Sequence, residues 1–212
     1  MYMPAHFDES RPDEVVRLLR DYPLGALVIT GPDGLDANHL PFEYEPESGR
    51  MGCLRAHIAR ANPLWQQASD GDQVLVIFQG SQGYLSPNWY PSKHETHRQV
   101  PTWNYQVVHV HGELLFHDDE RYVRGVVARL TREHEQRTGE PRPWRMTDSD
   151  ADYIDGMLKA IVGIEIRISR IVAKSKLSQN KELRDRRGAV DALLNHNEQL
   201  AKAMRDTFPS DD

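Results

Sequence analysis

The chain lacks the features that identify several large protein classes. Its 212 residues include one cysteine, Cys53, so no disulfide can form within the chain, which suits a reducing compartment. No segment approaches the ~20 consecutive apolar residues that span a bilayer. Residues 1–7 have neither a basic flank nor an apolar run and are not typical of a secretory signal. The sequence therefore predicts a cytoplasmic protein with no membrane association.

Charge and motif composition exclude further classes. A formal net charge of −6 gives none of the positive field that nucleic-acid-binding proteins use. There is no glycine-rich phosphate loop, no nucleophile elbow and no cysteine pair for zinc. The pairs His94/His97 and His109/His111 have spacings found in metal sites, but no carboxylate or thiolate motif accompanies them. We therefore expect no metal site, and these patterns assign no catalytic residue.

What the chain has is a series of short strands separated by turns rich in Gly, Asp and Pro. Such strands, without a regular strand–helix alternation, favour a small barrel over a doubly wound parallel sheet. We expect one domain over residues 1–212, with a helical insertion at about 118–160 and a C-terminal helical tail at about 188–206. The predicted strands are 26–30, 37–44, 51–57, 73–79, 83–86, 102–116 and 164–168, and the predicted helices are 11–21, 62–68, 118–137, 151–159 and one near the C-terminus.

The segment 85–105 carries the densest signal. It contains three prolines, two tryptophans and two tyrosines among many hydrogen-bonding side chains. The prolines argue against a core element, and the aromatic residues argue against an ordinary solvated loop. Trp103 and Tyr105 are expected on one face of the strand that follows and Asn104 on the other. The functional interpretation is a ring platform for a planar ligand; the alternative is core aromatics beside a turn-stabilising Asn.

Two further segments could bind an anion. In His57–Pro63, a strand ends, Arg60 follows and a helix begins, and both a guanidinium and a helix N-terminus attract phosphate. The alternative is that Arg60 is a surface residue and Asn62 simply caps the helix. Lys174–Lys181 is a donor-rich stretch that could close over a ligand, or it could be a solvated connector.

Taken together, six blocks of the sequence resemble the PaiB family, described as FMN-binding negative transcriptional regulators. The blocks run in order from residue 1 to near residue 194, with small departures at Ala56, Asn88 and Lys181, where glycine, serine and arginine are expected. They are Met1–Phe7, His39–Phe42, His57–Pro63, Ser86–Lys93, Val100–Tyr105 and Lys176–Asn180.

The resemblance implies an α+β fold, mainly β: an FMN-binding split β-barrel of the pyridoxamine phosphate oxidase and flavin reductase kind, with flanking helices and a C-terminal helix. It also implies a homodimer with FMN near the subunit interface. The FMN-binding residues that it implies are His39, Leu40 and Pro41 beside the isoalloxazine; Arg60 and Asn62, with His57 nearby, at the phosphate; Lys93, Thr102, Trp103 and Asn104 along the ring and ribityl chain; and Lys176, Gln179 and Asn180 closing the site from the same or the second subunit.

Three functions remain open from the sequence. The first is a flavin-binding regulator or sensor, for which direct DNA contact rests on the resemblance alone. The second is an FMN-dependent oxidoreductase or flavin reductase, with His57 and Tyr105 as the acid–base candidates and no catalytic residue assigned. The third is a haem-binding or haem-degrading split barrel using His94 or His109.

Overall fold

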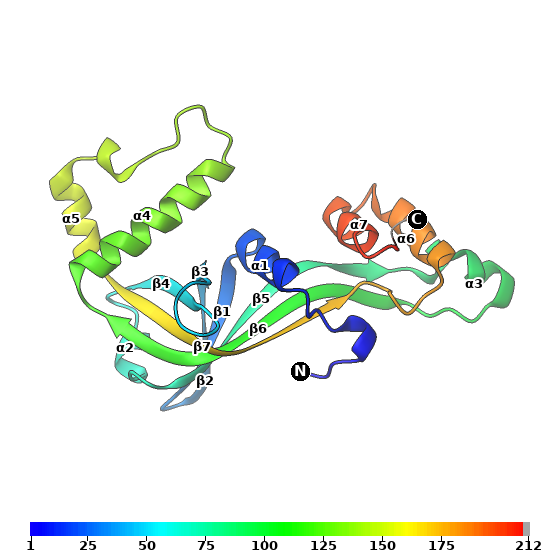
Figure 1. Cartoon of the computed structure of the whole chain (residues 1–212), viewed down its shortest axis with the longest axis horizontal. Helices are drawn as coiled ribbons and strands as arrows, with labels where there is room; N and C mark the ends of the chain where they lie inside the picture. Colours follow the sequence, from blue (N-terminus) through cyan, green and yellow to red (C-terminus); the bar gives the residue numbers. More distant parts are fainter. Residues whose placement is uncertain (210–212) are drawn as a thin grey trace. The chain divides into compact units, whose positions relative to one another are not determined.

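The computed structural model describes residues 1–209 and has the predicted α+β composition. In this part of the chain, seven strands form one sheet in the order β2-β1-β5-β6-β7-β4-β3 (Figure 1). The strands are β1 Leu24–Gly31, β2 Gly34–Pro41, β3 Glu43–Glu45, β4 Cys53–Ala59, β5 Gln73–Leu85, β6 Thr102–His117 and β7 Ile161–Lys176. The α-helices are α1 Pro12–Asp21, α2 Leu64–Gln67, α3 Pro91–Thr96, α4 Glu120–Arg137, α5 Ala151–Lys159, α6 Leu183–Leu193 and α7 Glu198–Arg205, with short 3₁₀ turns η1 Ala5–Phe7, η2 Pro87–Trp89 and η3 Met146–Asp148.

The chain divides into two compact units. Unit 1 contains residues 1–18, 79–108 and those from 172 onward, and unit 2 contains residues 19–78 and 109–171. The long strands β5, β6 and β7 each contribute residues to both units. The prediction of a single domain over the whole chain stays a prediction.

Unit 2 is built on antiparallel pairings of β1 with β2 and β5, and of β4 with β3 and β7. The alternation predicted from the isoleucines of β7 is confirmed: Ile164 and Ile166 are fully buried, and Arg167 is exposed. Gly112 in β6 is required by close packing, because a Cβ there would lie 2.4 Å from the carbonyl oxygen of Arg167.

The helix predicted after residue 118 is confirmed as α4. The Asp119 carboxylate accepts a hydrogen bond from the Tyr122 backbone N–H at 2.8 Å and so caps the helix start. Two residues after α4, Gly139 has a φ of 75°, a left-handed conformation that glycine adopts without strain. The apolar stripe of α4 packs against α5 in a cluster of Val123, Ile154 and Leu158 (Figure 1).

The C-terminal tail of unit 1 differs from the single helix that we predicted. It forms two helices, α6 and α7, which lie side by side in Figure 1. The break arises at Asn197, whose backbone is not helical and whose side-chain oxygen caps α7 by accepting a hydrogen bond from the Leu200 backbone N–H at 3.0 Å. Both helices bury Val190, Leu193, Leu200 and other residues in the core of unit 1.

The prediction that residues 85–105 contain no core element is wrong. Pro87 and Pro91 each begin a short helical turn, η2 and α3, because a fixed φ suits the first helical position. These turns bring Tyr90 into the core beside Leu85, with both side chains fully buried. The prolines therefore fold the segment back on unit 1.

Strand boundaries also differ from prediction. β7 continues to Lys176, so the first part of the segment expected to be a polar connector is strand. Polar residues are buried there because they find partners. The backbone of Lys174 forms a β-bridge with Asp8, its ammonium donates to the Tyr2 carbonyl at 3.2 Å, and Ser175 accepts a hydrogen bond from Gln106 at 3.1 Å. The strand predicted over 37–44 is split at the buried Phe42, and residues 73–85 form one continuous strand rather than two.

Candidate functional site

The residues implied by the family resemblance fall into one group in each unit. The unit 1 group is Lys93, Thr102, Trp103, Asn104, Lys176, Gln179 and Asn180, and the unit 2 group is His39, Leu40, Pro41, His57, Arg60 and Asn62.

A pocket of about 540 Å³ in unit 2 contains none of these residues, whereas a smaller pocket of unit 1 contains four of them. This unit 1 pocket has a volume of about 220 Å³ and combines the start of β6 with the segment that follows β7. The lining residues are Phe7, Val100, Pro101, Thr102, Asn104, Lys176, Ser178, Asn180 and Lys181. The structure therefore brings together Thr102, Asn104, Lys176 and Asn180.

Two ammonium groups give the unit 1 pocket its charge. Lys176 Nζ donates to the Thr102 hydroxyl and to the Trp103 carbonyl, and Lys181 Nζ donates to the Gln99 side-chain oxygen. Within residues 1–209, no ion pair joins either lysine to a carboxylate. Burial lowers the pKa of Lys176, and the nearby charges of Lys174 and Lys181 lower it further. An anionic ligand would supply the missing countercharge, and a neutral carbonyl oxygen would accept a hydrogen bond from either ammonium.

Asn104 and Gln179 shape the turn that ends β7. Ser178 has a φ of 66°, which is strained for a residue other than glycine. The Asn104 amide donates to the Ser178 hydroxyl at 2.9 Å, and Gln179 accepts from the Leu177 N–H and donates to the Ser175 carbonyl. These bonds hold the turn and leave Lys176 and the exposed Asn180 at the pocket.

The remaining unit 1 residues lie outside this pocket lining. Trp103 has half of its side chain exposed and contributes its carbonyl to Lys176. Lys93 lies on α3, where its carbonyl accepts from the His97 N–H. The Tyr105 ring instead lies 5.4 Å from the Lys174 ammonium, a cation–π contact.

Sequence reasoning missed five residues of the pocket lining: Phe7, Val100, Pro101, Ser178 and Lys181. All five lie in segments that the motif blocks or the donor-rich stretch had marked. Their side chains had no signal of their own in the sequence. The pocket forms through contacts between positions far apart in sequence, such as the β-bridge between Asp8 and Lys174.

In unit 2, Arg60 is engaged within the protein. Its guanidinium donates to both oxygens of Asp118, at 2.5 and 3.0 Å, and to the carbonyls of Lys159 and Ile161. The charge-assisted hydrogen bonds from Arg60 lower the pKa of the Asp118 carboxyl. A phosphate that bound Arg60 would therefore have to displace Asp118.

Asn62 joins the strand β2 to the turn that follows β4. Its amide donates to the Asn38 side-chain oxygen at 2.8 Å, and its own oxygen accepts from the Leu64 N–H at 2.9 Å. The capping role is therefore present, but α2 has only four residues and offers little helix dipole. His39, Leu40 and Pro41 follow Asn38 on β2, which is an edge strand of the sheet.

His57 is half-buried on β4, and its Nδ1 is buried without a hydrogen-bond partner in the described structure. Burial lowers the pKa of this imidazole. His57 is therefore a neutral group near neutral pH, able to accept or donate a proton if a ligand reaches it.

The shifted pKa of His57 predicts a pH dependence of stability. An unfolded histidine titrates near 6.5, so below that pH the unfolded state binds a proton that the folded state does not. His57 therefore lowers the free energy of unfolding as pH falls through that value, by up to about 1.4 kcal/mol per pH unit. Urea unfolding at pH 8 and at pH 5.5 measures the free energy of unfolding at each pH. The decrease from pH 8 to pH 5.5 should be larger for the native chain than for His57→Gln. Equal losses would contradict the prediction.

Two of the four histidines considered for metal or haem have partners within the protein. His94 Nε2 contacts the Asn88 carbonyl at 3.2 Å, and His111 Nε2 contacts Arg170 at 2.9 Å. Among residues 1–209, no three His, Cys, Asp or Glu side chains are arranged to hold a metal ion. In the same residues, no helix is both long and apolar enough to cross a bilayer.

Comparison with known proteins decides the family. A family model described as "Putative FMN-binding domain" matches residues 1–170. The chain belongs to this FMN-binding family. FMN is accordingly its cofactor. The two lysines and the lack of a carboxylate in the unit 1 pocket are chemically compatible with the acceptor oxygens of a flavin.

Two relatives of the FMN-binding chain match along most of their length. Protease synthase and sporulation protein PAI 2 of Bacillus subtilis is 29% identical over 96% of this chain and 94% of its own. The uncharacterized protein AN0679 of Emericella nidulans is 30% identical over 92% of this chain and 91% of its own. The resemblance to the PaiB family is confirmed.

Solved structures support the fold. The FAD and heme binding protein from Mycobacterium smegmatis has a TM-score of 0.56 at 16% identity, covering 86% of this chain and 79% of its own. The conserved hypothetical protein Rv2991 from Mycobacterium tuberculosis has a TM-score of 0.58 at 11% identity, covering 86% of this chain and 94% of its own. The predicted α+β split β-barrel of flavoproteins is confirmed.

Arg60→Ala tests the phosphate position implied by the resemblance. If Arg60 receives the phosphate, the variant should bind FMN at least about tenfold more weakly and bind riboflavin, which lacks the phosphate, as well as the native chain does. Asp118→Asn removes the competing carboxylate and should strengthen FMN binding alone. Both affinities can be measured by flavin fluorescence titration. If the two ligands respond equally in both variants, Arg60 is a structural residue.

Proposed function

We propose that this chain is an FMN-binding regulatory protein that responds to its flavin. The observation that carries the proposal is the similarity to protein PAI 2, which extends along nearly the whole of both chains. The name of that relative places it in protease synthesis and sporulation. The negative formal charge gives no support to direct DNA contact, so we propose that regulation acts through the flavin-bound protein and a partner.

We further propose that the unit 1 pocket contacts the flavin. Lys176 and Lys181 supply two cations without a carboxylate partner in the described residues, and Thr102 and Asn180 supply neutral hydrogen-bonding groups. Such a set suits the ring and ribityl oxygens of FMN. The phosphate position at Arg60 and Asn62 is a separate proposal, which rests on the family resemblance.

The first experiment is a visible absorption spectrum of the purified chain before and after addition of FMN, with the released ligand identified after heat denaturation. A stoichiometric flavin spectrum is expected. An absence of bound flavin in the presence of excess FMN would contradict the proposal. Light scattering during size-exclusion chromatography of the same sample tests the homodimer that the resemblance implies.

A gel-shift titration tests the DNA contact that the resemblance implies. The probe is the region upstream of the chain's own gene, and the titration is repeated at several salt concentrations with oxidised and reduced FMN. Direct recognition would produce a shift that weakens steeply as salt rises. We expect no such shift, and a salt-dependent shift would replace the indirect mode of regulation with a direct one.

An FMN-dependent oxidoreductase is the second candidate, favoured by His57. This neutral imidazole, with one ring nitrogen free of any described partner, could exchange a proton with a substrate while the flavin exchanges electrons. Anaerobic addition of NADH or NADPH to the FMN-loaded chain tests this role. Rapid bleaching of the flavin would favour the enzyme, and no reduction by either nicotinamide would count against it.

A further inference from the structure

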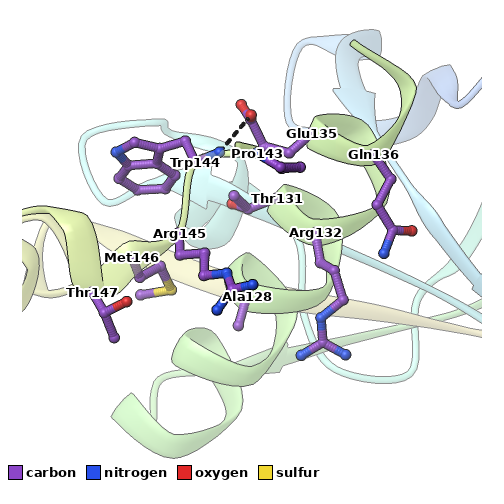
Figure 2. Close-up of a pocket in the computed structure, with 10 residues that line it drawn as sticks. All are labelled: Ala128, Thr131, Arg132, Glu135, Gln136, Pro143, Trp144, Arg145, Met146 and Thr147. Carbon is purple, nitrogen blue, oxygen red and sulfur yellow. Dashed lines mark hydrogen bonds between the residues drawn. The ribbon is translucent and has the colours of Figure 1, made fainter. Parts of the chain in front are cut away.

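The segment after α4 forms one wall of the cavity of unit 2. Residues 143–147 lie across the C-terminal half of α4 (Figure 2). A cavity of about 540 Å³ lies between this segment and the helix. This volume is in the range of small-molecule sites. The helix contributes Ala128, Thr131, Arg132, Glu135 and Gln136, and the facing segment contributes Pro143, Trp144, Arg145, Met146 and Thr147.

Three interactions hold the two walls of this cavity in place. The Trp144 backbone N–H donates to the Glu135 carboxylate at 2.9 Å, drawn as the dashed line in Figure 2. The Arg145 N–H donates to Asp148 at 2.9 Å and begins the turn η3. Met146 packs against the apolar cluster between α4 and α5. The segment is therefore tied at its middle and its end, so the cavity is a defined feature of unit 2.

The charges in the cavity are unbalanced. Three other arginines of α4, namely Arg124, Arg129 and Arg137, pair with carboxylates. Arg132 and Arg145 are exposed and, within residues 1–209, form no ion pair. Glu135 is the one carboxylate among the lining residues, and it accepts the Trp144 N–H. The cavity is therefore lined by two guanidinium groups and one carboxylate, and that carboxylate already accepts a hydrogen bond within the protein.

An aromatic surface accompanies the two guanidinium groups. The Trp144 side chain is 39% exposed although it lines the cavity, and Pro143 and Met146 extend the apolar wall. Figure 2 shows Arg132 and Arg145 extending on the same side of the view, with Trp144 at the other end of the group. An exposed indole and two cations that line the same cavity are suited to a flat ring that carries a negative charge.

We propose that this cavity is a second ligand site, which binds a small planar anion: an aromatic ring bearing a carboxylate. Arg132 and Arg145 bind the carboxylate, and Trp144 stacks with the ring. None of the residues implied in FMN binding lines the cavity, so the proposal stands independently of the proposed function.

Isothermal titration of the full, FMN-saturated chain tests the site with three probes. Naphthoate should bind once per chain. Naphthyl methanol, which lacks the charge, and cyclohexanecarboxylate, which lacks the flat ring, should each bind at least about tenfold more weakly. The visible flavin spectrum is recorded in parallel and should not change. No binding of naphthoate at millimolar concentration, or binding that releases FMN, would overturn the proposal.

Matched variants locate the binding. The double variant Arg132→Gln/Arg145→Gln should lose at least about tenfold in naphthoate affinity, and Trp144→Leu should lose the preference for naphthoate over cyclohexanecarboxylate. Arg121→Gln is the control, because Arg121 is exposed on α4 but does not line the cavity. Unchanged affinity in the double variant, or an equal loss in the control, would overturn the proposal. Unfolding temperatures of all variants establish that each is folded.

Discussion

Replacing Asp185 by alanine is expected to lower the free energy of unfolding by about 3 kcal/mol. Asp185 is 1% exposed and accepts three hydrogen bonds: from the Ser92 N–H at 2.9 Å, the Ser92 hydroxyl at 2.6 Å and the Gln99 amide at 3.3 Å. Alanine removes the acceptor and leaves these donors in a buried position. An unpaired buried polar group costs more than the hydrogen bond itself contributes.

Asp191→Ala is the matched control, because Asp191 is an exposed aspartate of the same helix α6. The free energy of unfolding of this control, measured with urea, should lie within about 0.5 kcal/mol of the native value. The value for Asp185→Asn should lie between those of the two alanine variants. Equal stabilities for Asp185→Ala and Asp191→Ala would contradict the prediction. The loss should also reach the unit 1 pocket, because Gln99 accepts the hydrogen bond of Lys181.

Secondary structure was predictable where a local pattern decided it. The isoleucine alternation of β7 and the capped, striped helix α4 are both set by neighbours within a few residues. The burial of Tyr90 and the extension of β7 to Lys176 were not predictable, because distant segments cause them. Tyr90 packs with residues of α6 and α7, and Lys174 pairs with Asp8.

The candidate site shows the same division. Motif blocks singled out Thr102, Asn104, Lys176 and Asn180, which meet in one pocket, and their role in flavin binding stays a prediction. Whether a polar side chain holds the fold or faces a ligand could not be predicted. Gln179 serves the turn around Ser178, and Arg60 is bound by Asp118, which lies 58 residues away in the sequence.

Lys176→Met is expected to weaken the binding of FMN and of riboflavin alike, by about tenfold to a hundredfold. Lys176 is the pocket cation that contacts both Thr102 and Trp103 and has no carboxylate partner in residues 1–209. Methionine keeps the length and apolar stem of lysine and removes only the charge and its donors. Lys202→Met, an exposed position on α7, should leave both affinities unchanged.

Comparing the two flavins separates the roles of Lys176 and Arg60. A loss confined to FMN in Lys176→Met would place the phosphate at this lysine and remove that role from Arg60. Unchanged binding of both flavins would mean that the unit 1 pocket does not hold the cofactor. Lys93→Met tests a residue implied by the resemblance that lies outside the pocket lining, so a comparable loss there would extend the site toward α3.

The pH dependence of flavin binding gives an independent test of the Lys176 ammonium. Burial and the charges of Lys174 and Lys181 lower its pKa, so it loses its proton at a lower pH than an ordinary lysine. Binding that needs the protonated amine should be complete below that pKa and should weaken as pH rises through it. Flavin titrations from neutral to alkaline pH should show this weakening in the native chain but not in Lys176→Met. A parallel decline in both proteins would assign the titration to another group and contradict the role of Lys176.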